Sequence, residues 1–217
     1  MKTRVRFWFA ALWLVVVAGG IARVSSAGSG DAAIRLPRTG QTVCYDSSGG
    51  VVACTNTGQD GDLQKGAQWP VPRFIANADT TITDHLTGLV WAPDGNLLPS
   101  RDPQWEKQGT AFDGAVTWQH ALDYVAKLNA EHYLGHSDWR MPNFTELESL
   151  VNRARPSTAR WLNSEGFVEV QAGDYYWSST SYINDAGKAW VVDMSFGNVN
   201  YLSKAKGHFV WPVRAGQ

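Results

Sequence analysis

Short apolar runs separated by turn residues dominate this chain from residue 73 onward. Residues 73–75 and 80–83 flank the turn-forming segment 77–79, and residues 89–91 follow a second turn at 84–88. Runs this short, bounded by Asn, Asp and Gly, are typical of antiparallel strands joined by tight turns. The pattern therefore predicts a β-meander at the start of the regular structure.

Two stretches have helical spacing instead. Residues 114–129 carry one apolar stripe, made of Trp118, Ala121, Leu122, Val125 and Leu128. This spacing predicts a helix with one buried face. A shorter helix is predicted from Asn143 to about Asn152, because Glu146 stands three residues after Asn143, as in a capping box.

The chain then returns to strand patterns, predicted at residues 175–180, 189–194, 197–201 and 208–211. Their alternation fits a sheet with one buried face. Strands, two helices and strands in this order predict an α+β domain in which helices cover one antiparallel sheet.

The N-terminal segment has the pattern of a secretory signal peptide at residues 1–27. Basic Lys2, Arg4 and Arg6 precede an apolar stretch, and small residues end at Ala27. The alternative is an uncleaved anchor helix, but the apolar stretch is shorter than the roughly 20 residues that span a bilayer. We expect an exported protein, periplasmic, outer-surface or extracellular, with no transmembrane segment after cleavage.

The charge balance argues against one class of partner. Residues 1–27 hold four of the 19 Lys and Arg and none of the 20 Asp and Glu, so 15 basic and 20 acidic side chains remain. A general nucleic-acid binder needs a basic face, so nucleic acid is not an expected partner. The remaining length suits one domain at residues 73–217, preceded by an irregular leader at 28–72 that is rich in Gly, Ser, Thr, Asp and Pro.

Both cysteines of the chain lie in that leader. Cys44 and Cys54 flank a turn-forming Ser-Ser-Gly-Gly segment, and the residues on either side can pair as a short hairpin. In an oxidising compartment we expect a structural disulfide that staples the leader. The spacing is not that of a CxxC redox motif.

Three blocks of sequence, in order, resemble a known family. They are TITDHLTGLVW at residues 81–91, GHSDWRMP at 135–142 leading into Thr145-Glu146-Leu147, and YWSST at 176–180 followed by Ala189-Trp190 and Val213-Arg214. Together they resemble the Lcl C-terminal domain family, the terminal domain of collagen-like bacterial adhesins, over roughly residues 60–215. The collagen-like Gly-x-y repeat of those adhesins is missing from this chain.

The resemblance implies a C-type lectin-like fold, a looped antiparallel β-sheet flanked by two helices. It also implies surface or periplasmic placement and a tendency toward adhesion or glycan binding. We therefore expect a non-enzymatic module that binds polysaccharide or a cell-surface protein; the alternatives are a structural subunit of a surface assembly and an uncharacterised enzyme. The oligomeric state stays open, and the resemblance supplies no catalytic residues.

Two groups of residues are candidates for ligand binding. Lys188, Lys204, Lys206 and His208, with Arg214, gather near the last strands and form a basic patch if they share a face. The alternative is that such lysines protect a sheet edge. Trp105 and Trp161, with Trp69, fall in predicted loops, where they would either stack on a sugar ring or cap the core.

Other motifs are assigned structural or metal-binding roles. Asp138-Trp139-Arg140 is interpreted as a structural anchor ahead of the second helix. Asp60 and Asp62, and likewise Asp94 and Asn96, lie in short acidic loops of a kind that can bind calcium, although neither completes an EF-hand. No other cofactor and no catalytic residue is predicted.

Overall fold

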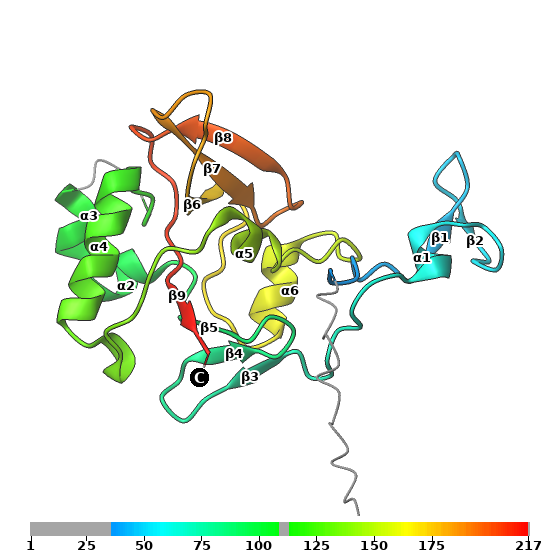
Figure 1. Ribbon diagram of the computed structural model, residues 1–217, viewed down its shortest axis with the longest axis horizontal. Coiled ribbons are helices and arrows are strands. Elements are labelled where there is room, and N and C mark those ends of the chain that lie inside the picture. The colour runs from blue at the N-terminus through cyan, green and yellow to red at the C-terminus, as the bar shows by residue number, and fades with distance from the viewer. Residues whose placement is uncertain (1–35, 109–112, 217) are drawn as a thin grey trace, which may run out of the picture. The chain divides into compact units, whose positions relative to one another are not determined.

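The computed structural model describes residues 36–108 and 113–216 (Figure 1). The predicted signal peptide at 1–27 lies outside the described residues. Within the described ranges, no helix is both long and apolar enough to cross a membrane.

The described part of the chain forms nine strands, six α-helices and one 3-10 helix. The strands are β1 (Cys44–Tyr45), β2 (Val51–Val52), β3 (Phe74–Ala76), β4 (Ile82–Asp84), β5 (Leu89–Trp91), β6 (Tyr175–Ser181), β7 (Lys188–Asp193), β8 (Val199–Ser203) and β9 (Val213–Ala215). The helices are α1 (Asp60–Leu63), α2 (Leu97–Arg101), α3 (Pro103–Gln108), α4 (Trp118–Ala130), η1 (Tyr133–Gly135), α5 (Phe144–Glu148) and α6 (Thr158–Ser164). The molecule is therefore α+β, as predicted.

The leader contains the predicted disulfide-closed hairpin. Strands β1 and β2 pair antiparallel with Cys44 opposite Val52, and Cys44 and Cys54 form a disulfide. The turn is stabilised by Asp46, whose carboxylate accepts hydrogen bonds from the backbone N–H groups of Ser48 and Gly50. The leader is less irregular than predicted, because the short helix α1 follows the hairpin.

The prediction of a single antiparallel sheet is wrong, since the strands form three small ones. The hairpin is the first, β3-β4-β5-β9 is the second and β6-β7-β8 is the third. Strand β9 pairs with β5, with Trp91 opposite Val213, so segments far apart in the sequence lie side by side (Figure 1). The predicted strand at 208–211 is also wrong: His208 and Phe209 make only isolated bridges, and the last strand begins at Val213.

The two predicted helices exist with shifted ends. Helix α4 starts at Trp118 rather than Gly114, because the Thr117 side chain accepts a hydrogen bond from the His120 N–H and caps the helix there. Helix α5 has the predicted capping box between Asn143 and Glu146, but it ends at Glu148. Helices α1, α2, α3 and α6 were not predicted.

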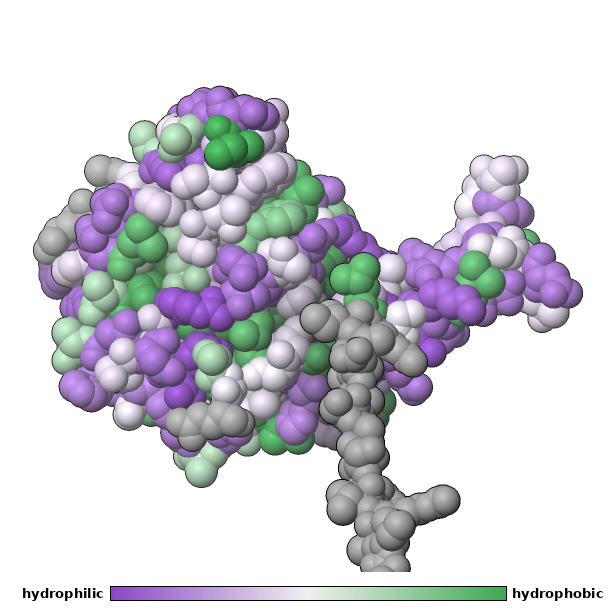
Figure 2. Space-filling model, in the orientation of Figure 1, coloured by the Kyte–Doolittle hydropathy of each residue, from purple (hydrophilic) through white to green (hydrophobic). Residues whose placement is uncertain are grey.

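The core is built largely from aromatic side chains. Trp91, Trp177 and Trp211 are fully buried. The indole N–H of Trp177 donates to the Val116 carbonyl and that of Trp211 to the Ala92 carbonyl, which offsets the cost of burying these donors. Trp118, predicted on the buried stripe, packs against the core while remaining partly exposed. On the face shown in Figure 2, hydrophobic residues are interspersed among hydrophilic ones.

Candidate functional site

The outward face of the sheet β6-β7-β8 presents the candidate site. Strand β7 alternates, so Ala189 and Val191 are fully buried while Lys188 and Trp190 remain partly exposed. In register, Trp190 lies opposite Tyr201 of β8 and Lys188 opposite Ser203. Alternation therefore places a lysine and two large aromatic side chains on the same outward surface.

The aromatic side chains of this surface form a compact cluster. The rings of Tyr182 and Tyr201 stack with centroids 4.0 Å apart and planes 4° from parallel. Trp190 packs edge-on against both tyrosines, with centroid distances of 5.6 Å to each. Phe144 supports Trp190 from helix α5 at 5.2 Å. Since Tyr201 is 39% exposed, the cluster offers ring surface to solvent.

One lysine, Lys188, flanks the cluster, whereas the side chain of Lys204 lies on the opposite face of the sheet, with Leu202 and Ser181. The Lys188 ammonium lies 5.5 Å from the centroid of the Tyr201 ring, and the Lys204 ammonium lies 4.0 Å from that of the Trp118 ring. Lys204 also donates to the Ser181 hydroxyl at 2.7 Å, which orients it along β6. We call the set Tyr182, Lys188, Trp190 and Tyr201 the aromatic–lysine face. Such a surface can stack on an apolar ring and attract a negative group together.

The structure brings together only part of the predicted basic patch. The backbones of Lys188 and Lys204 lie close, because the Lys204 N–H donates to the Gly187 carbonyl at 2.9 Å, but their side chains point to opposite faces of the sheet; Lys206 is exposed in the turn after β8. Arg214 is buried and its guanidinium donates to Asp138 at 2.7 Å. The prediction that Arg214 belongs to an exposed basic patch is therefore wrong.

The prediction that His208 belongs to the exposed patch is also wrong, because His208 is buried. Its Nδ1 lies 2.9 Å from an Asp174 carboxylate oxygen, and its ring packs edge-on to Trp177. Burial lowers the pKa of His208 below its usual value, and this outweighs the opposing attraction of Asp174. His208 therefore belongs to the packing beneath the sheet.

The tryptophans predicted in loops lie elsewhere. Trp105 is part of α3 and stacks on His120 with centroids 5.0 Å apart. Trp161 is part of α6, and Trp69 packs against it at 5.4 Å, where it donates its indole N–H to the Arg38 carbonyl. The loop predictions for Trp105 and Trp161 were wrong, because α3 and α6 are too short for a periodic signal, whereas Trp69 lies in a loop as predicted.

Asp138, Trp139 and Arg140 have structural contacts, as interpreted. Asp138 pairs with Arg214, which lowers the pKa of Asp138. Trp139 is buried, and Arg140 makes a two-pronged contact with Glu146, at 2.6 and 2.7 Å. The two charges thus tie the loop to β9 and to α5, rather than to each other.

The acidic residues proposed for calcium are each engaged locally. Asp60 accepts from the Thr39 hydroxyl and Asp62 from the Gly58 N–H. Asp94 accepts from the Asn96 N–H and the Ser100 hydroxyl, and Asn96 donates to the Asp113 carbonyl. Among the residues described, no group of three or more His, Cys, Asp or Glu side chains is arranged to hold a metal ion.

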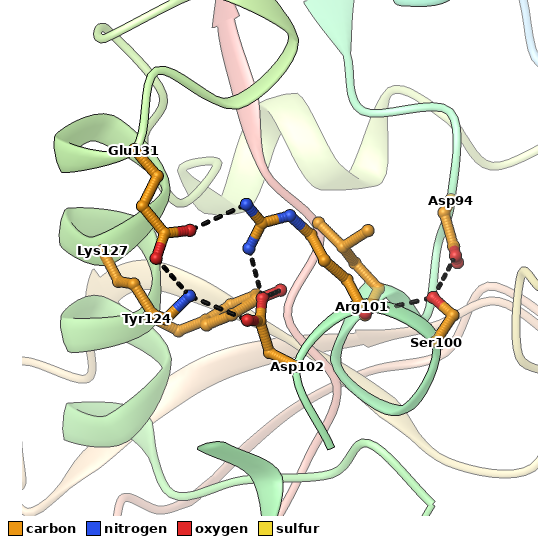
Figure 3. Close-up of polar contacts among 8 residues, drawn as sticks. Asp94, Ser100, Arg101, Asp102, Tyr124, Lys127 and Glu131 are labelled. Atoms are coloured by element: carbon orange, nitrogen blue, oxygen red, sulfur yellow. Dashed lines mark hydrogen bonds and ion pairs between the residues drawn. The ribbon is translucent and has the colours of Figure 1, made fainter. Parts of the chain in front are cut away.

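A polar network missed by the sequence analysis joins α2 to α4 (Figure 3). Asp102 accepts hydrogen bonds from Lys127 at 2.8 Å, from Tyr124 at 2.9 Å and from Arg101. Glu131 accepts from Arg101 and Lys127, each at 2.7 Å. Burial opposes ionisation of Asp102, but the three donors prevail and lower its pKa. Two cations and two carboxylates neutralise one another, so the network holds the helices together.

A model of the Lcl C-terminal domain family matches residues 80–214. The chain belongs to this family, as the three sequence blocks predicted. No curated protein matches the sequence.

Proposed function

We propose that this chain is an exported, non-enzymatic binding module that holds a glycan on the aromatic–lysine face. The observation that carries the proposal is the exposed Tyr201 ring, stacked on Tyr182 and flanked by the Lys188 ammonium. The C–H face of a pyranose ring packs well on an aromatic ring, and a lysine next to it favours a carboxylated or sulfated sugar.

The rigidity of the cluster supports this proposal. Trp190 contacts both tyrosines and is backed by Phe144, so four rings hold one another in place. A ring that is already ordered loses little conformational entropy when a ligand binds. The positive charge of Lys188 also stands out on a chain whose acidic residues outnumber its basic ones. An acidic glycan is therefore the expected ligand class.

The proposal also includes a C-type lectin-like topology and a location outside the cytoplasm. The β5–β9 pairing closes the chain between residues 91 and 213 into one large loop, which supports a C-type lectin-like fold. The disulfide and the basic-then-apolar N-terminus support export to the periplasm, outer surface or extracellular space.

A structural subunit of a surface or periplasmic assembly is the second candidate, favoured by the leader hairpin. Tyr45, Val51 and Val52 are 47%, 73% and 37% exposed on its two short strands. Exposed apolar side chains on unpaired strand edges favour association with another chain. Concentration-dependent sedimentation that Val51→Ser abolishes would support this candidate.

A glycan array tests the first proposal. The oxidised full-length chain is applied to neutral, uronate-bearing and sulfated glycans, with calcium and with chelator. We expect retention on an acidic glycan, loss of retention for Tyr201→Ala and for the Lys188→Ala/Lys204→Ala pair, and recovery of the glycan unchanged in mass. No retention in either condition would contradict glycan binding, and loss only in chelator would instead support the acidic loops as calcium sites.

A further inference from the structure

A cavity of about 750 Å³ lies between the end of the leader and the segment around α6. Its leader wall is held in place by two backbone contacts: Thr39 accepts a hydrogen bond from the Arg153 N–H at 3.1 Å, and Arg38 accepts from the Trp69 indole at 2.8 Å. The cavity shares no residue with the aromatic–lysine face. Its size falls in the range of about 300–1,000 Å³ that is usual for small-molecule sites.

One wall of the cavity is largely apolar. Trp69 and Trp161 lie side by side there, with ring centroids 5.4 Å apart and planes tilted by 32°, and prolines 70, 72 and 156 continue the surface. The Trp161 indole N–H is already satisfied by Glu165, at 2.8 Å. Trp161 is only 8% exposed and the Arg73 guanidinium lies 4.6 Å from the Trp69 ring centroid, so Trp69 and the prolines supply most of the accessible carbon surface for an apolar group.

Two nearly buried donors lie among the lining residues. Arg73 is 3% exposed and binds Asp84 through Nε and Nη2, but its Nη1 is buried without a hydrogen-bond partner in the described structure. Asn152 is 6% exposed, and its Oδ1 accepts from the Ala154 N–H. A buried donor without an acceptor, such as Arg73 Nη1, is costly, and a ligand oxygen that reaches it would satisfy it.

The rim of the cavity is positive. Arg153 and Arg155 line it, and Glu165 is the one carboxylate among its described lining residues. Arg153 is weakly paired with Glu148 at 3.7 Å and donates to the Phe196 carbonyl at 3.1 Å, whereas the Arg155 guanidinium contacts no partner within the ranges described. An arginine matches the two oxygens of a carboxylate through parallel hydrogen bonds.

From this arrangement we propose that the cavity is a second binding site, for a small ligand that carries a carboxylate on a flat apolar ring. The ring lies against Trp69 and Trp161, and the carboxylate meets Arg155 at the rim, with Asn152 beneath. This site is independent of the proposed glycan surface.

Calorimetry on the full-length oxidised chain, with 2-naphthoate as the probe and the uncharged 2-naphthamide as its matched control, tests this inference. We expect naphthoate to bind about tenfold more tightly than naphthamide, and Arg155→Gln to remove most of that difference. Arg160→Gln is the matched control variant, because Arg160 borders only the neighbouring hollow of about 320 Å³.

Three results would overturn the inference: equal affinity for naphthoate and naphthamide, full competition by inorganic phosphate at equal concentration, or equal loss in Arg155→Gln and Arg160→Gln. The Lys188→Ala/Lys204→Ala pair should bind naphthoate as the unaltered chain does. That variant separates failure of the cavity from failure of the aromatic–lysine face.

Discussion

Arg73 and Asp84 form a two-pronged ion pair that is almost completely buried, with side chains 3% and 0% exposed and N–O distances of 2.9 and 2.8 Å. Asp84 also accepts from the Leu86 N–H and the Thr87 hydroxyl, so the pair fixes the turn between β4 and β5. Arg73 donates in addition to the Ser149 carbonyl after α5. One ion pair thus ties the β3-β4-β5-β9 sheet to the segment that follows α5.

Removing one partner of this pair should be strongly destabilising, because the other charge stays buried and unpaired. We expect Asp84→Asn to lower the free energy of unfolding by about 3–5 kcal/mol. The control is Asp185→Asn, since the Asp185 side chain is 49% exposed and its contact with Lys188 is 3.3 Å; we expect a change of less than about 1 kcal/mol there. Urea denaturation measures both, and similar losses in the two variants would contradict the prediction.

The capping box of α5 should have a smaller, measurable effect. Asn143 accepts from the Glu146 N–H at 2.9 Å, and Glu146 accepts in return from the Asn143 N–H at 2.9 Å. Asn143→Ala leaves one helix-start donor unsatisfied, so we expect a loss of about 1 kcal/mol in unfolding free energy. Ser137→Ala, in an exposed turn, is the control. An unchanged thermal midpoint for Asn143→Ala would show that the cap contributes nothing.

Burial of His208 should make stability depend on pH near neutrality. Because its pKa is lowered from 6.5 in the folded state, the folded chain binds fewer protons there than the unfolded chain. Keeping His208 neutral in the folded state contributes to the free energy of unfolding. This contribution is fully present above the pKa of His208 in the unfolded chain, and it decreases as the pH falls through about 6.5 and below. Asp174 and Lys206 are the charged groups that act on it, in opposite directions.

We therefore expect the unfolding free energy to fall between about pH 7.5 and pH 5, and to fall less steeply in His208→Asn. Denaturant titrations across this range provide the measurement. Asp79 contributes only at more acidic pH, because a hydrogen bond from Thr81, with a further one from His136, lowers its pKa to about 2. An equal slope in both proteins would exclude His208 as the source.

Loss of the disulfide should affect the leader alone. The bond closes a loop of sequence separation 10, and closing such a loop contributes roughly 2–3 kcal/mol. In a Cys44→Ser/Cys54→Ser variant, we expect backbone amides of β1 and β2 to exchange with solvent faster while amides of β6 to β8 keep their protection. Faster exchange throughout would show that the hairpin supports the whole fold.

Features with local signals were predictable from the sequence. The hairpin needs only the Ser-Ser-Gly-Gly turn between Cys44 and Cys54, and α5 needs only Asn143, Glu146 and the preceding proline. Helices α2, α3 and α6 span only five to seven residues, fewer than two helical turns, so no apolar period could reveal them. The final strand was misplaced because its partner, β5, lies more than a hundred residues earlier.

In the candidate site, too, residues with local signals were predictable and residues with distant partners were not. Lys188 and Lys204 were found because neighbouring antiparallel strands bring them together. His208 and Arg214 were wrongly placed on the surface because their carboxylate partners, Asp174 and Asp138, lie 34 and 76 residues away in sequence. Tyr182 and Tyr201 carried no sequence motif, since their stacking depends on the register of β7 and β8 and on the segment that joins β6 to β7.

The central claim is that the aromatic–lysine face binds an acidic glycan. The most direct test is the affinity of the chain for the acidic glycan that retains it most strongly on the array. Calorimetry would compare the unaltered chain with Lys188→Ala/Lys204→Ala, and with Lys65→Ala as a control lysine exposed in the leader. We predict affinity about tenfold lower in the double variant, from the loss of the Lys188 cation beside the Tyr201 ring, and an unchanged affinity in Lys65→Ala. Equal affinities in all three proteins would contradict the claim that this face binds the glycan.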